Sequence, residues 1–125
     1  MKLTSLRPMI WVDNVEQTIE WYVSVLGFEE INYAEEWQWG LVKKDEVCLM
    51  MAKPDEHTSY NGPQFTGSFY FNTDNVDEWW DKLKNSPYIF YGLENFEYGM
   101  REFAIKDCNG YILQFGQELL DEEDR

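Results

Sequence analysis

Few residues in this chain have the type and spacing that catalysis by side chains requires. The single histidine, His57, lies in a polar segment with nearby proline and glycine, which is typical of a solvated loop. Cys48 and Cys108 have no C-x-x-C spacing and no context that indicates an activated thiolate. Glu102 is the best candidate for a general acid or base, yet no partner is evident beside it. The sequence therefore indicates no complete set of catalytic residues.

Aromatic and acidic residues are abundant instead. The 125 residues include 8 Phe, 8 Tyr and 6 Trp, and the formal net charge is −14. Trp and Tyr combine a large apolar face with one polar atom, so they suit ligand clefts and subunit interfaces. Binding to a nucleic-acid backbone relies on clustered Lys and Arg, which an acidic chain lacks. The composition favours a flat, cationic or amphipathic ligand and argues against nucleic acid as a partner.

The acidity also has a simpler explanation, in which it only keeps the protein soluble. Residues 121–124 (Asp-Glu-Glu-Asp) supply four of the charges and are expected to be solvated. No stretch approaches the roughly 18 apolar residues that span a membrane, and the first five residues lack the apolar core of a signal peptide. We therefore expect a cytoplasmic protein with reduced thiols and no membrane partner.

A short sequence motif that occurs twice predicts how the helices and strands are arranged. Residues 13–16 (Asp-Asn-Val-Glu) return as residues 74–77 (Asp-Asn-Val-Asp). Each copy follows an apolar run with strand character and opens a helical pattern, and further runs with strand character follow each helix. The repeat predicts an α+β fold of two βαβββ modules. The predicted parts of this single domain, residues 1–125, are module one at 6–52, a linker at 53–66, module two at 67–118 and an acidic tail at 119–125.

Local signals place the helices and strands within each module. Asn14 and Asn75 are good N-cap residues, with Gln17 and Glu78 at the capping-box position, and Gly27 suits the C′ position of the first helix. The patterns predict helices over 15–26 and from 76 to a stop at 85–87. They predict strands over 6–12, 28–33, 37–42, 47–52, 68–73, 88–93, 101–106 and 111–116, with a tight turn at 107–110.

Several sequence segments together resemble those of a known family. They are residues 8–12 (Pro-Met-Ile-Trp-Val), the helix end at 26–28 (Leu-Gly-Phe), residues 98–103 and the closing hairpin at 107–116. Over roughly residues 6–118, the chain resembles the vicinal oxygen chelate superfamily, which includes glyoxalase I, extradiol dioxygenases, and fosfomycin- and bleomycin-resistance proteins. The resemblance implies paired βαβββ modules that form a half-open curved sheet around a cleft, with the helices outside.

The resemblance also implies where a metal would be held. In the metal-dependent members, the first and last strands of each module supply His, Gln or Glu ligands. These positions fall at Arg7 and Met50 in module one and at Ser68 and Gln114 in module two. Arg offers no acceptor, and Met suits soft metals. The departure favours a member with no metal, no cofactor and no catalytic residues, similar to the bleomycin-resistance proteins, which are acidic cytoplasmic homodimers that sequester a cationic ligand in aromatic-lined grooves.

We expect the ligand-binding residues on strands that face the cleft. Trp37 and Trp39, two apart on a predicted strand, would form a stacking platform or pack under the first helix. Gln114 would orient a ligand or be satisfied within the sheet, and Arg7 would pair with a ligand carboxylate or with an acidic neighbour. The predicted ligand-binding set is Arg7, Trp37, Trp39, Met50, Ser68, Tyr70, Tyr98, Glu102 and Gln114.

The residues and the resemblance together predict a metal-free, homodimeric protein that binds a cationic or aromatic small molecule. Two alternatives remain open. One is a divalent-metal-dependent glyoxalase-like lyase, transferase or dioxygenase, with atypical ligands such as Gln114, Glu102 and Glu46. The other is an interaction protein with an exposed apolar patch in place of a pocket.

Overall fold

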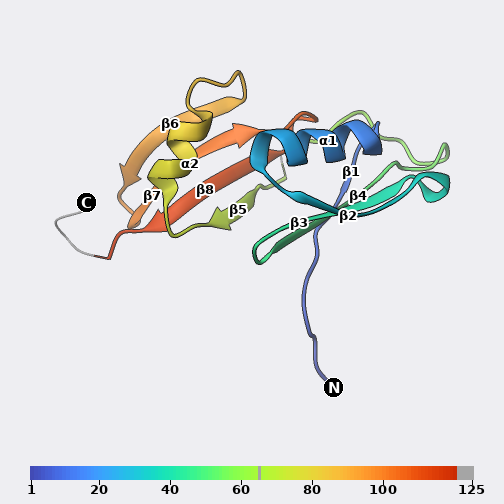
Figure 1. The fold of residues 1–125 in the computed structure, drawn as a ribbon, viewed down its shortest axis with the longest axis horizontal. Coiled ribbons are helices and arrows are strands. Elements are labelled where there is room, and N and C mark those ends of the chain that lie inside the picture. The colour runs from blue at the N-terminus through green and yellow to red at the C-terminus, as the bar shows by residue number, and fades with distance from the viewer. Residues whose placement is uncertain (65, 121–125) are drawn as a thin grey trace. The chain divides into compact units, whose positions relative to one another are not determined.

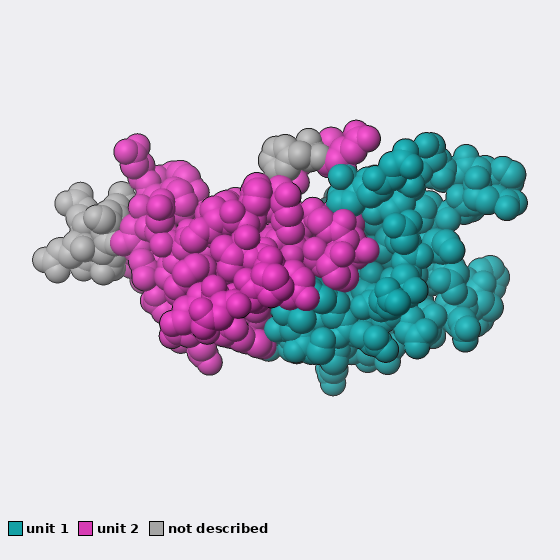
Figure 2. All heavy atoms as spheres, turned by 90° about the horizontal axis from the view of Figure 1, so that it is seen from above, with its two compact units in different colours: residues 1–63 teal, residues 64–125 magenta. Residues whose placement is uncertain are grey.

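The computed structural model describes residues 1–64 and 66–120 and contains two compact units, Met1–Pro63 and Gln64–Arg125 (Figure 2). Their boundary lies within segment 53–66, which the sequence predicts as a linker. Each unit has one α-helix and one four-stranded mixed sheet in βαβββ order, so the predicted α+β fold of two such modules is confirmed.

Unit 1 follows the order of elements that the repeat predicts. Its elements are β1 (Met9–Trp11), α1 (Val15–Leu26), β2 (Glu29–Ala34), the 3-10 helix η1 (Glu35–Trp37), β3 (Trp39–Lys44) and β4 (Val47–Ala52) (Figure 1). The strand order is β1-β4-β3-β2; β1 is parallel to β4, and the other neighbours are antiparallel. Within the described residues, neither this unit nor the other contains a helix with the length and apolarity needed to cross a membrane.

The predicted signals begin and end α1. The side-chain oxygen of Asn14 accepts the backbone N–H of Gln17 at 2.9 Å, and Gly27 ends the helix in the left-handed region at φ 77°. The helix packs closely on β3, because a Cβ atom added at Gly40 would lie 2.6 Å from the Cδ1 atom of Ile19. A glycine at position 40 therefore permits this close packing of helix on sheet.

Unit 2 has the same plan with longer final strands. Its elements are β5 (Phe69–Asn72), α2 (Val76–Leu83), β6 (Ile89–Phe96), β7 (Met100–Lys106) and β8 (Ile112–Glu118) (Figure 1). The strand order is β5-β8-β7-β6, with β5 parallel to β8 and the other neighbours antiparallel.

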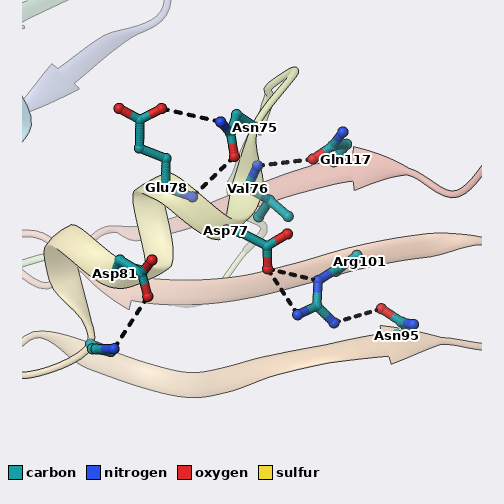
Figure 3. Close-up of polar contacts among 9 residues, drawn as sticks. Asn75, Val76, Asp77, Glu78, Asp81, Asn95, Arg101 and Gln117 are labelled. Atoms are coloured by element: carbon teal, nitrogen blue, oxygen red, sulfur yellow. Dashed lines mark hydrogen bonds and ion pairs between the residues drawn. The ribbon is translucent and has the colours of Figure 1, made fainter. Parts of the chain in front are cut away.

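The N-terminus of α2 is held by a reciprocal cap and by the last strand. Asn75 accepts the backbone N–H of Glu78 at 3.1 Å, and its own amide donates to the Glu78 carboxylate at 3.1 Å (Figure 3). The backbone N–H of Val76 donates to the side chain of Gln117 in β8 at 3.0 Å. These contacts satisfy helix donors that would otherwise lack partners and fix the start of α2 against the sheet.

Aromatic rings join α2 to one face of the sheet. The ring of Trp79 lies 4.9 Å from that of Phe115 in β8, and Trp80 lies 5.3 Å from Phe103 in β7, measured between centroids. Phe103 and Phe115 stack on each other at 5.2 Å. Because side chains alternate along a strand, the residues next to these phenylalanines project from the opposite face.

Two strand predictions in unit 1 are wrong in ways that affect the predicted site. Strand β1 is shorter than the predicted 6–12, so Arg7 precedes it and is exposed. Trp37 ends the 3-10 helix, and only Trp39 belongs to β3. Between them Gln38 has φ 47°, and its side chain donates to the carbonyl of Glu35 at 2.8 Å. This left-handed residue interrupts the strand, so the premise that Trp37 and Trp39 share one strand face fails.

Candidate functional site

The sheet face of unit 2 that points away from α2 contains a buried carboxylate. Glu102 in β7 is 0% exposed. Its neighbour Phe103 packs against Trp80 of the helix, so strand alternation directs Glu102 to the other face. A buried carboxylate loses its hydration, at an effective cost of several kcal/mol, unless the protein supplies other partners.

Three neutral donors supply those partners. Tyr70 of β5 donates to the Oε1 atom of Glu102 at 2.8 Å, Tyr91 of β6 donates to Oε2, and the amide of Gln114 in β8 donates to Oε2 at 3.2 Å. Tyr98, in the turn between β6 and β7, lies near enough for the charge of Glu102 to help raise its pKa. The negative charge is thus stabilised by the dipoles of two phenols and one amide, none of which carries a positive charge.

Gln114 connects this cluster to the start of unit 2. Its amide nitrogen donates to the hydroxyl of Tyr91 at 2.8 Å as well as to Glu102, and its carbonyl accepts from the hydroxyl of Ser68. Its polar atoms are therefore hydrogen-bonded within the unit, which is the second of the two roles expected for it. We call Ser68, Tyr70, Tyr91, Tyr98, Glu102 and Gln114 the Glu102 cluster.

Gly116 makes room for the cluster. A Cβ atom added there would lie 2.0 Å from the hydroxyl oxygen of Tyr70 and 2.6 Å from its ring carbon Cζ. Gly116 also pairs in register with Glu102 across β7 and β8. The missing side chain therefore lets the Tyr70 ring cross β8 and reach the carboxylate.

The phenols in the cluster are held in their protonated form. Burial and then the hydrogen bond and charge of Glu102 raise the pKa of Tyr70 above its usual value. Burial is again the first cause at Tyr91, and with Glu102 it raises that pKa to about 12, although the Gln114 hydrogen bond acts in the opposite direction. Partial burial and Glu102 raise the pKa of Tyr98 as well. At neutral pH all three therefore remain hydrogen-bond donors.

The structure brings some of the predicted ligand-binding residues together. Ser68, Tyr70, Tyr98, Glu102 and Gln114 join one cluster in unit 2. The other four predicted residues belong to unit 1 and are not part of that cluster: Arg7 before β1, Trp37 in η1, Trp39 in β3 and Met50 in β4.

Sequence reasoning missed two members of the arrangement. Tyr91 was one aromatic residue among many in its predicted strand, and no pattern distinguished it. Gly116 had a usable signal, because a glycine inside a strand pattern indicates close approach of another group. Both matter only because the sheet order brings β6 and β8 to either side of β7.

Two concavities lie on the helix sides of the units. One of about 700 Å³ in unit 1 lies along α1 and β2, where Glu16, Glu20, Glu29 and Glu30 accompany Ile19, Val23 and Phe28. The other, about 400 Å³ in unit 2, contains Arg101. That guanidinium donates to Asp77 at 2.8 Å and to Asn95 at 2.9 Å (Figure 3), so its charge is already paired. Neither concavity includes Glu102.

The four positions that the resemblance assigns to a metal do not fit a divalent ion. In unit 2 the single carbonyl oxygen of Gln114 already accepts from Ser68, and in unit 1 the positions carry Arg7 and Met50. Among residues 1–64 and 66–120, no group of three or more His, Cys, Asp or Glu side chains is placed to hold a metal ion. Glu102, the carboxylate of the cluster, already accepts from three protein donors.

The family of the chain follows from a match to a sequence model of that family. Residues 5–115 match the model of the Glyoxalase/Bleomycin resistance protein/Dioxygenase superfamily. The chain belongs to this superfamily. The resemblance seen in the sequence is thereby confirmed at superfamily level. No curated protein matches the chain.

Several solved structures are similar to this protein over nearly the whole chain. TioX from Micromonospora sp. ML1 is 16% identical with a TM-score of 0.76, covering 93% of this chain and 99% of its own. A protein of unknown function from Agrobacterium tumefaciens str. C58 is 17% identical with a TM-score of 0.76, covering 95% and 97%. A lactoylglutathione lyase from Agrobacterium tumefaciens is 17% identical with a TM-score of 0.69, covering 95% and 96%. At these identities the likeness shows the fold alone.

Proposed function

We propose that this protein is a metal-free small-molecule binding protein that captures a cationic or aromatic ligand at the Glu102 cluster. The observation that carries the proposal is the buried carboxylate, whose named hydrogen-bond partners are all neutral. A buried negative charge whose hydrogen-bond partners among the described residues are neutral favours a positively charged ligand, most strongly where water is excluded. The net charge of −14 attracts cations over a longer range.

The aromatic rings around Glu102 offer surfaces for such a ligand. Tyr98 is 65% exposed, and its ring stacks on Phe96 with centroids 5.4 Å apart. Tyr70 is 37% exposed. A cation over the face of a tyrosine ring gains about 0.5–2 kcal/mol, depending on how far it is desolvated.

The same contacts support binding over chemistry by this cluster. A general base needs an acceptor free to take a proton, and a nucleophile needs an adjacent base. Here the oxygens of Glu102 already accept from protein donors, and the neighbouring hydroxyls are phenols with raised pKa values. Assembly as a homodimer and the absence of nucleic-acid and membrane partners stay predictions, the first of them on the resemblance to bleomycin-resistance proteins alone.

Titration calorimetry with aromatic probes of positive, zero and negative charge tests the proposal. We expect the cationic probe to bind best, and Glu102→Gln to weaken it about tenfold, or about 1.4 kcal/mol, without affecting a neutral probe. Asp81→Asn, which removes one charge from α2 across the sheet, is the matched control and should bind like the parent protein. Equal binding of all three probes, or no effect of Glu102→Gln, would contradict the proposal.

The alternative function is a divalent-metal-dependent enzyme with atypical ligands. Native mass spectrometry of freshly purified protein distinguishes the two. A mass without metal, or with an organic adduct, supports the binding protein, and an adduct mass begins the search for the ligand. One divalent metal per chain would overturn the proposal and direct work to metal-dependent assays.

A further inference from the structure

The concavity of unit 2 on the α2 side of its sheet is separate from the Glu102 cluster. Its volume is about 400 Å³, and small-molecule sites generally occupy about 300–1,000 Å³. Arg101, which lines it, comes directly before Glu102 in β7, so strand alternation directs the two side chains to opposite faces of the sheet. A ligand in this concavity would therefore occupy a second site, on the other face from the one that the proposed function uses.

Arg101 keeps unused donors in this concavity. A guanidinium carries five N–H groups in a fixed fork. The Nε and Nη2 atoms of Arg101 donate to the same oxygen of Asp77, at 3.1 and 2.8 Å, and Nη1 donates to Asn95 at 2.9 Å (Figure 3). Within the described residues, these bonds use three of the five N–H groups. The remaining two can donate to a ligand, and a carboxylate is the acceptor that matches a guanidinium fork best.

Gln117 adds a neutral donor beside this guanidinium. Gln117 in β8 is the register partner of Arg101 in β7, so the two side chains leave the same face of the sheet as neighbours. The carbonyl oxygen of Gln117 accepts the backbone N–H of Val76 at 3.0 Å, which directs that end of the amide to the start of α2 (Figure 3). Its amide nitrogen is therefore available as a further donor to a ligand carboxylate.

The same concavity also offers negatively charged acceptors. Asp77 uses only its Oδ1 atom with Arg101, so Oδ2 accepts no hydrogen bond from the described part of the chain. Glu118 contributes a second carboxylate to the lining. Two carboxylates against one guanidinium leave an excess of negative charge in a chain that is itself acidic, so a simple anion is repelled. A simple cation, for its part, leaves the donors of Arg101 unused.

We propose that this concavity binds a small zwitterion, of which an α-amino acid is the simplest. The ligand's carboxylate accepts from Arg101 and Gln117, and its ammonium group donates to Asp77 and Glu118. An α-amino acid carries both charges on one carbon atom, which suits a site where the opposite charges of Arg101 and Asp77 lie 2.8 Å apart. Leu119 and Leu120 also line the concavity, so an apolar side chain complements the rest of it. The proposal does not rest on the proposed function.

Three probes with the same apolar side chain test the proposal. L-leucine has both charges, N-acetyl-L-leucine lacks the ammonium group, and L-leucinamide lacks the carboxylate. Each is titrated into the full chain at equal ionic strength and slightly acidic pH, where both amines are protonated, with calorimetry or ligand-observed NMR as the measurement. We expect L-leucine to bind about tenfold more tightly than either analogue, because each analogue leaves charged groups of the site without a partner. Equally tight binding of either analogue, or no binding of L-leucine at millimolar concentration, would overturn the proposal.

Two variants test the roles of the charged residues. Asp77→Asn removes the partner of the ammonium group but keeps an oxygen that accepts from Arg101, so we expect L-leucine to weaken about tenfold and N-acetyl-L-leucine to bind more tightly. Arg101→Gln removes the partner of the carboxylate, so we expect L-leucine to weaken and L-leucinamide to bind more tightly. A general loosening of the concavity would weaken all three probes together, so these opposite shifts report recognition of the two charges.

Asp81→Asn is the matched control. Asp81 is also an acidic residue of α2 in an ion pair, with Lys84 at 3.2 Å, but it does not line the concavity. It should leave the affinities of all three probes unchanged. The side chain of Asp77 is 61% exposed, so Asp77→Asn is expected to melt close to the parent protein and remain testable. An unchanged ratio of L-leucine to N-acetyl-L-leucine affinity in folded Asp77→Asn, or an equal change in Asp81→Asn, would overturn the proposed site.

Discussion

The two units place different side chains at equivalent register positions. Across the parallel pair of each sheet, Met9 lies opposite Met50 in unit 1, whereas Tyr70 lies opposite Gln114 in unit 2. On the neighbouring antiparallel pair, Trp39 is opposite Ala52 in unit 1, whereas Glu102 is opposite Gly116 in unit 2. The same backbone plan thus carries an apolar set in one unit and a hydrogen-bonded polar set in the other.

One position shows why the polar set is confined to unit 2. The Tyr70 ring crosses β8 only because position 116 has no side chain, and the equivalent position in unit 1 is Ala52. Exchanging Met9 for tyrosine in unit 1 would therefore not reproduce the arrangement. The polar face of unit 2 therefore depends on Gly116 as well as on the groups that form hydrogen bonds.

Removing the carboxylate should have the largest effect on stability. Glu102→Leu leaves the donors of Tyr70, Tyr91 and Gln114 without their acceptor, so we expect the free energy of unfolding to fall by about 2–4 kcal/mol. Urea denaturation measures the change. Trp39→Leu at the equivalent position in unit 1 breaks no such network and should cost less; an equal loss would show that the two faces do not differ in this way.

Filling the space at position 116 should have the next largest effect. Gly116→Ala places a Cβ atom against the Tyr70 ring, so the ring must move and its hydrogen bond to Glu102 breaks. We expect a loss of about 1–3 kcal/mol in urea denaturation, together with weaker binding of cationic probes. The reverse change in unit 1, Ala52→Gly, should cost only about 0.5–1 kcal/mol from backbone entropy and leave binding unchanged. Normal probe binding by Gly116→Ala would contradict the role given to this glycine.

Deleting a single hydroxyl should have a smaller effect. Tyr70→Phe keeps the ring and removes one donor to the carboxylate, so we expect a loss of about 1–1.5 kcal/mol by thermal or urea unfolding. Met9→Leu, the equivalent position in unit 1, is half exposed and should change the stability by less than about 0.5 kcal/mol. Similar losses in the two variants would remove the distinction between the faces.

The pH dependence should be the smallest effect and should appear only in alkali. The folded pKa values of Tyr70, Tyr91 and Tyr98 exceed the ordinary tyrosine value of 10.0, so the native state holds these protons more tightly than the unfolded state does. Their contribution to stability is therefore complete below about pH 10 and is lost as pH rises through the folded pKa values. Tyrosine absorbance near 295 nm should show a late-titrating group near pH 12 that disappears in Tyr91→Phe. Titration of every tyrosine near pH 10 would contradict this prediction.

Much of the architecture could be predicted because its signals are local. Each of these signals depends on a few adjacent residues. They are the repeated Asp-Asn-Val motif, the helix caps at Asn14 and Asn75, and the left-handed conformation of Gly27. The structure confirms them within a residue or two. Met50 and Gln114, which the resemblance assigns to the same position of the two modules, lie opposite Met9 and Tyr70 in the parallel pair of each sheet.

The errors and omissions have two physical causes, one local and one that depends on distant parts of the chain. The shared face predicted for Trp37 and Trp39 fails because of one left-handed residue, Gln38, in a sequence that otherwise has strand character. Tyr91 and Gly116 were missed because their importance comes from neighbouring strands and not from neighbouring residues.

The sequence by itself determined the superfamily, the two βαβββ modules and an acidic, aromatic chain without the family's metal ligands. Only the tertiary structure decided that Glu102 is buried and accepts hydrogen bonds from three neutral donors. The physical reason is that these donors come from β5, β6 and β8. They meet at one carboxylate only when the sheet pairs in the order β5-β8-β7-β6 with its observed register.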